Sequence, residues 1–171
     1  MMIFAKFKQL LNILVIIAIA ILWVLLDAHV AIAQDSAVNY TYSEIRRQDF
    51  SHKDLKGGVF AAADARGSNF EGSDVSNSIL TKGIFVETNL KDSNFTSSLM
   101  DRVSFANSDL TNAIFKDAVA TSTNFEGTTI TGADFTDAIL DRYQVYLMCQ
   151  RAEGTNPTTG VDTRYSLGCR D

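Results

Sequence analysis

Hydrophobic residues recur at every fifth position of this chain from residue 50 to residue 140. All nineteen positions of this phase are apolar, and nine of them are phenylalanine. An α-helix has a period of about 3.6 residues and a strand a period of about 2, so neither element produces this stripe. A fixed short period kept over this length predicts a solenoid, in which each unit buries its apolar face only against its neighbours. The positions are Phe50, Leu55, Phe60, Ala65, Phe70, Val75, Leu80, Phe85, Leu90, Phe95, Met100, Phe105, Leu110, Phe115, Ala120, Phe125, Ile130, Phe135 and Leu140.

The two positions before each apolar residue are restricted as well. Two places before it, a small residue stands at sixteen of the nineteen steps, which suits a narrow interior. One place before it Asp or Asn recurs, and these side chains favour tight corners because they bond to nearby backbone. Units such as Ser-Asn-Phe-Glu-Gly at residues 68–72 and Ala-Asp-Phe-Thr-Asp at 133–137 resemble those of the pentapeptide-repeat family. The resemblance covers roughly residues 44–145.

The resemblance implies an all-β fold, a right-handed quadrilateral β-helix with four pentapeptides in each coil. We therefore expect no α-helix between Phe50 and Leu140. Residues twenty apart in the sequence should stack above one another on the same side of the solenoid.

The N-terminus has the pattern of an export signal. Lys6 and Lys8 precede the apolar run Leu10–Leu26, and the small residues Ala31 and Ala33 follow it. This order predicts a secretory signal peptide over residues 1–33, and the alternative is an uncleaved membrane anchor. Cleavage removes Lys6, Lys8 and Asp27, and so changes the formal net charge from −5 to −6.

An exported chain allows the two cysteines to be interpreted. Cys149 and Cys169 both follow the last regular repeat, and the chain has no other cysteine. In an oxidising compartment the expected state is one Cys149–Cys169 disulfide, with free thiols or a metal pair as alternatives. A metal pair is disfavoured because His52, the one histidine of the mature chain, lies at the opposite end of the sequence.

The segments on either side of the repeats are expected to cap the open ends of the solenoid. We place an N-terminal cap at residues 34–47, the β-helix at 48–145 and a C-terminal cap containing the disulfide at 146–171. Segment Asp141–Ala152 fits a short amphipathic helix with Leu140, Tyr143, Leu147 and Met148 turned inward. The tail, with its Ser-Leu-Gly-Cys at residues 166–169, resembles the C-terminal extension of exported pentapeptide-repeat proteins of cyanobacteria and chloroplasts.

The residue inventory argues against catalysis. The mature chain has one histidine, no tryptophan, no cysteine outside the expected disulfide, and no glycine-rich phosphate loop. The carboxylates are placed for corner turns, so neither a cofactor nor a metal site is expected. Lys and Arg are scattered without a basic run, which argues against nucleic-acid binding. No membrane association is expected once the signal is removed.

One surface series differs from its counterparts when the sequence is folded at twenty residues per coil. The positions one place before the apolar phase form four series, of which three carry mostly Asp, Asn, Ser, Thr or Gln. An exposed aliphatic strip in a polar surface usually marks contact with a partner or with a second copy. The alternatives are that a terminal segment covers these residues, or that they point inward. The fourth series is wholly apolar: Val59, Ile79, Leu99, Val119 and Ile139.

Two functions fit these observations. The first is a non-enzymatic exported scaffold or protein-binding module in the thylakoid lumen or periplasm. The second is that of pentapeptide-repeat relatives that imitate DNA and interact with topoisomerase. DNA mimicry requires a strongly acidic rod in the compartment that holds DNA, whereas this mature chain has a charge of −6, an apolar face and an export signal. The first function is therefore favoured.

Overall fold

The computed structural model describes residues 12–23 and 37–170 of the chain. The chain divides into two compact units, Met1–Ser36 and Ala37–Asp171. In the first unit, residues 12–23 form a helix whose side chains are exposed. The expected cleavage site after Ala33 lies outside the described residues. Within the described ranges, no helix combines the length and the apolar character needed to cross a bilayer.

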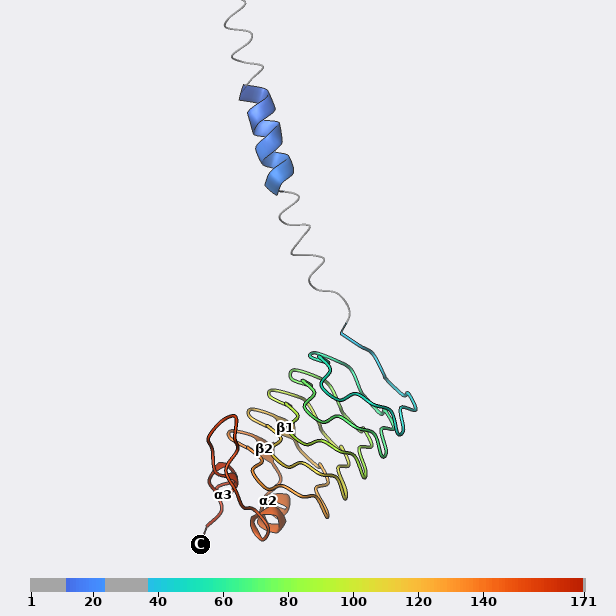
Figure 1. The fold of residues 1–171 in the computed structure, drawn as a ribbon, viewed down its shortest axis with the longest axis vertical. Helices are drawn as coiled ribbons and strands as arrows, with labels where there is room; N and C mark the ends of the chain where they lie inside the picture. The colour runs from blue at the N-terminus through green and yellow to red at the C-terminus, as the bar shows by residue number, and fades with distance from the viewer. Residues whose placement is uncertain (1–11, 24–36, 171) are drawn as a thin grey trace, which may run out of the picture. The chain divides into compact units, whose positions relative to one another are not determined.

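From residue 39 to residue 140 the second unit is a stack of coils, in which each bridged residue pairs in parallel with a residue twenty positions away. Figure 1 shows these coils following one another from the cyan N-terminal end to the orange C-terminal end. Most pairs are single bridges, and strand β1 (Val119–Ala120) pairs with strand β2 (Ile139–Leu140) in the register Val119↔Ile139. No helix occurs between residues 50 and 140, as predicted.

The first coil begins earlier than the sequence predicted. Bridges Asn39↔Val59 and Glu44↔Asp64 lie in the segment expected to be a separate cap, so the boundary at residue 48 is wrong. The reason is that the five-residue phase continues backwards through Ile45 and Tyr40. Ile45 is buried, and the ring of Tyr40 stacks on Phe60 at a centroid distance of 5.3 Å. Residues 39–47 therefore belong to the solenoid.

The core is a column of rings and aliphatic side chains along the axis of the coils. Every residue of the five-residue phase from Phe50 to Phe135 is at most 4 % exposed. Phe115 stacks on Phe95 and on Phe135 at centroid distances of 5.0 Å, one coil away in each direction. Phe105 lies edge-on to Phe95 and Phe115, at 6.0 and 6.1 Å. Each ring is thus packed by rings of its own coil and of the neighbouring coils, which is the geometry that aromatic pairs prefer.

Small residues two places before each ring let the coil close around the core and supply hydrogen bonds inside it. The hydroxyls of Ser68, Ser98 and Ser108 donate to backbone carbonyls 23 positions earlier, in the preceding coil. The hydroxyls of Ser73 and Ser93 instead donate to the carbonyl three positions earlier. A buried hydroxyl without a partner is costly, and these bonds remove that cost.

The corners are built by Asp and Asn. The side-chain oxygen of Asn69 accepts the N–H of Glu71, and the same bond joins Asp74 to Ser76 and Asp109 to Thr111. The second residue of each corner has a positive φ, and at fifteen corners it is not a glycine. The side-chain bonds help to hold these unfavourable backbone angles.

The C-terminal end of the stack is covered by helix α2 (Arg142–Cys149), helix α3 (Thr163–Ser166) and the loops around them (Figure 1). The disulfide Cys149–Cys169 joins α2 to the tail, with an S–S distance of 2.05 Å. Arg151 fastens this cap to the last coils, because its guanidinium donates to the carbonyls of Phe125 (2.6 Å) and Thr128 (2.9 Å). The buried Asn156 does the same through its amide, which donates to the carbonyls of Asn112 and Gly132.

The orientation of α2 corrects two sequence predictions. The helix begins at Arg142, before the expected end of the repeats at residue 145, and it ends at Cys149 rather than Ala152. Met148 is buried as predicted, but Tyr143 is 68 % exposed instead of facing inward. The helix presents the neighbouring Gln144 to the last coils instead, where its amide oxygen accepts the N–H of Phe125.

Candidate functional site: an apolar strip on one face of the solenoid

The five residues singled out from the sequence lie in one ladder of parallel bridges, which we call the apolar strip: Val59, Ile79, Leu99, Val119 and Ile139. Ile79 and Leu99 are each 41 % exposed and Ile139 is 57 % exposed, while the two valines are half-buried. The side chains therefore point outward. At a coil spacing of about 4.8 Å, the strip is on the order of 20 Å long.

The strip lacks the corner hydrogen bonds that most other ladders have. In the three polar ladders, an Asp or Asn usually accepts the N–H two residues later, as Asn89 does for Lys91 and Asn124 for Glu126. An aliphatic side chain cannot accept that bond. All five residues of the strip thus give up a local interaction worth about 0.5–1.5 kcal/mol each. Corner stability alone does not account for an apolar residue at these five positions.

Charged residues border the strip on both sides. Because all coils run in the same direction, the corners that lead into this face stack on one side and the corners that leave it stack on the other. The incoming corners carry Asp117 and Asp137 at their second positions. On the outgoing side, an exposed basic residue stands three places after three of the strip residues: Lys82, Arg102 and Arg142, the last of which begins α2.

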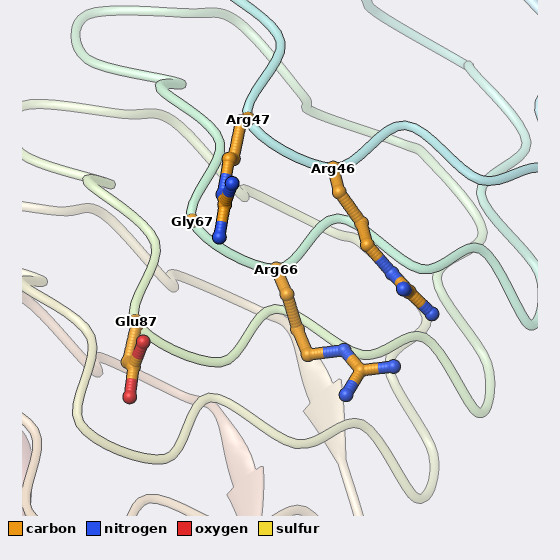
Figure 2. A pocket seen from close by; sticks show the side chains of 5 residues that line it. All are labelled: Arg46, Arg47, Arg66, Gly67 and Glu87. Atoms are coloured by element: carbon orange, nitrogen blue, oxygen red, sulfur yellow. The ribbon is translucent and has the colours of Figure 1, made fainter.

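A second surface feature, which the sequence reasoning missed, is a cluster of arginines near the N-terminal end of the stack. Arg46 and Arg66 are twenty residues apart, so they occupy equivalent corners of neighbouring coils. That spacing in the sequence could have predicted that the two arginines lie together. Figure 2 shows their side chains extending in the same direction. Arg47, Gly67 and Glu87 form the adjacent corner series, and the missing side chain of Gly67 leaves a shallow open pocket between them.

The arginine cluster is largely neutralised by one carboxylate. Arg46 and Arg66 both donate to Asp64, at 2.6 Å and 2.5 Å. Hydrogen bonds from Arg66 and Arg46 hold the pKa of the Asp64 carboxyl well below its ordinary value, and they raise the pKa of both guanidinium groups. Since two of the three arginines are paired in this way, the cluster has the character of a surface salt-bridge network.

The described residues contain neither a cluster of metal-ligating side chains nor a free cysteine. No group of three or more His, Cys, Asp or Glu side chains in the described ranges is placed to hold a metal ion. Cys149 and Cys169 are both in the disulfide, so neither is a free thiol. The apolar strip is therefore the best-formed candidate site, and its chemistry is that of a contact surface.

Comparison with known proteins agrees with the fold. The profile of pentapeptide repeats matches residues 49–81, 59–96 and 98–137 of the chain. A thylakoid lumenal protein of Arabidopsis thaliana, TL20.3, is 58 % identical over 31 residues, which cover 18 % of this chain and 11 % of that protein. The chain thus matches only about a tenth of the length of this curated relative.

Two solved structures of pentapeptide-repeat proteins are also similar. One comes from the thylakoid lumen of Arabidopsis thaliana; it is 31 % identical, with 80 % of this chain and 88 % of that chain covered and a TM-score of 0.41. The other is HetL of Nostoc, involved in regulating heterocyst differentiation; it is 16 % identical, with 61 % and 50 % covered and a TM-score of 0.39. The repeats, the step of twenty residues and the matched profile together show that this chain belongs to the pentapeptide-repeat family.

Proposed function

We propose that this protein is a non-enzymatic, exported scaffold that binds a protein partner through the apolar strip. The observation that carries the proposal is the ladder itself, in which five consecutive coils present an aliphatic side chain to solvent. These coils do so at the cost of the corner bonds made elsewhere. The rigid stack of coils holds the five side chains in line, so the surface needs little ordering when it binds.

An exported location is supported by the basic and apolar N-terminus and by the closed Cys149–Cys169 disulfide, which suits an oxidising compartment. The thylakoid lumen is the compartment named for the two Arabidopsis proteins that this chain resembles. DNA mimicry has less support, because it has no use for an aliphatic ladder on one face of the solenoid.

Affinity capture from the native compartment tests the binding function. The bait is the exported protein in three forms: wild type, Leu99→Asp, and Ile84→Asp as the matched control. Ile84 is also an outward aliphatic residue, 37 % exposed, but it belongs to a different ladder. We expect partners to be retained by wild type and by Ile84→Asp and lost with Leu99→Asp. Equal capture by all three forms would show that the strip is not the binding surface.

Tryptophan emission tests the export signal. Trp23 is the sole tryptophan of the chain, so removal of residues 1–33 abolishes this emission. Protein isolated from its native compartment that keeps tryptophan fluorescence would contradict cleavage and favour a retained membrane anchor.

A further inference from the structure

The apolar strip allows its occupant to be named. We propose that it docks against the same strip of a second copy of this chain, with the two stacks of coils parallel and related by a two-fold axis along the stack. This inference rests on the proposed function, because it identifies the partner of the same surface. Two observations favour a second copy as the partner: the spacing of the strip residues and the charges beside the strip.

The spacing of the strip matches that of another solenoid. Its side chains are spaced by one coil, about 4.8 Å, along a straight ladder. A second copy presents the same spacing, so each side chain of the strip can meet its counterpart along the whole length of the ladder. An α-helix repeats every 5.4 Å or so, and over four coils it falls out of step by about half a spacing. A flat face with coil spacing is therefore the best complement to the strip.

The charges beside the strip favour the parallel arrangement. A two-fold axis along the stack places the incoming corners of one copy against the outgoing corners of the other. Asp137 of one copy then lies level with Arg142 of the other, since both residues belong to the same coil. Asp117 likewise lies between the levels of Arg102 and Arg142. An antiparallel arrangement centred on Leu99 would place outgoing corners on outgoing corners, and so bring Arg102 of one copy level with Arg102 of the other. It would also move Asp117 and Asp137 away from the basic residues of the outgoing side.

The remaining charges at this border do not reverse that preference. Asp101 accepts the Nε–H of Arg102 at 2.7 Å, and Asp141 accepts the backbone N–H of Ser122 at 2.7 Å. Both carboxylates of the outgoing side are therefore already engaged. Lys56 and Lys116, on the incoming side, stand at the first positions of their corners, one residue further from the strip than Gly57 and Asp117. Although the mature chain is acidic overall, its charges at this border are balanced, and two copies can approach here without strong repulsion.

The size of the surface sets the strength of the dimer. A strip about 20 Å long and one side chain wide, with its charged borders, is smaller than the roughly 1,200 Å² total that stable complexes bury. The dimer is therefore reversible and forms only at high protein concentration.

Sedimentation equilibrium tests this self-association. The unit Ala37–Asp171 contains its whole core, so it can be studied by itself. Between about 10 µM and 1 mM we expect the average mass to rise from monomer towards dimer. Leu99→Asp should weaken association at least about tenfold, while Ile84→Asp should change it by less than about twofold. A wild-type unit that remains monomeric throughout would overturn the proposal.

Cysteine cross-linking tests the orientation. Val59 and Ile139 are four coils apart, about 19 Å, so a short bismaleimide cannot connect these two positions. In the parallel dimer, Val59→Cys links to its own counterpart in the second copy, and so does Leu99→Cys. In an antiparallel dimer only the central Leu99→Cys does so, and that result would refute the parallel arrangement.

The two experiments distinguish self-association from binding of a different protein. If the unit is monomeric but Leu99→Asp still loses the captured partner, then self-association is wrong and the binding function of the strip stands. If Leu99→Asp affects neither measurement, both are wrong.

Discussion

Two single substitutions, Leu99→Asn and Met100→Asn, compare a surface position of the solenoid with a core position. Leu99 belongs to the apolar strip and is 41 % exposed, while Met100 belongs to the five-residue phase and is fully buried. Asparagine is uncharged and is common in the polar ladders, so the same new side chain enters two opposite environments one residue apart.

The structure gives the expected magnitudes. Fully burying a leucine side chain is worth about 1.5–3 kcal/mol, so losing the buried three-fifths of Leu99 costs about 1–2 kcal/mol. The asparagine introduced by Leu99→Asn would regain the corner bond to the N–H of Asp101, which contributes about 0.5–1.5 kcal/mol. The two effects nearly offset each other. Met100→Asn removes a buried side chain, at about 2–5 kcal/mol, and buries an unpaired amide, at about 1–3 kcal/mol.

Calorimetry of the unit Ala37–Asp171 measures the difference. For a unit of this size about 1 kcal/mol corresponds to roughly 4 °C in Tm. We expect Leu99→Asn to lower the Tm by less than about 6 °C, and Met100→Asn to lower it by more than about 12 °C or to prevent folding. If Leu99→Asn destabilises the unit as much as Met100→Asn does, then Leu99 is covered in solution and the assignment of the strip to the surface is wrong.

Three further substitutions test the core, the cap and the charge network. Phe105→Ala should lower the free energy of unfolding by about 3–5 kcal/mol, because rings on four sides hold the void open; a loss below about 1 kcal/mol by denaturant titration would argue against a rigid ring column. Cys149→Ser should remove about 3 kcal/mol of stability and speed hydrogen exchange in residues 150–168, and unchanged exchange there would show that the cap does not need the disulfide. The pKa of Asp64 is lowered, so its contribution to stability is present above the ordinary aspartate pKa and is lost as pH falls towards the folded-state value. Asp64→Asn should therefore flatten the fall in Tm between about pH 4 and pH 2, and an unaltered pH profile would contradict the pairing with Arg46 and Arg66.

The repeats were predictable because their structure is local and periodic. A ring at every fifth position, a small residue two places earlier and Asp or Asn between them leave few backbone paths. The family resemblance added that four such units make a coil, so that residues twenty apart are neighbours, and the strip and the pairing of Val119 with Ile139 follow from that step. The error at the N-terminal boundary arose from neglecting Tyr40 and Ile45, which continue the same phase.

The sequence by itself therefore determined the repeating unit and the residues of the core, because one five-residue unit constrains both, and its resemblance to the family supplied the coil of twenty residues that places residues in one ladder. Tertiary structure decided what the repeat does not specify. Tyr143 is exposed while the neighbouring Gln144 bonds to the backbone of Phe125, and both lie in a segment without periodicity. The exposed fractions of Ile79, Leu99 and Ile139 likewise depend on how neighbouring coils and the cap cover them, which is a property of the packed molecule and not of the pattern.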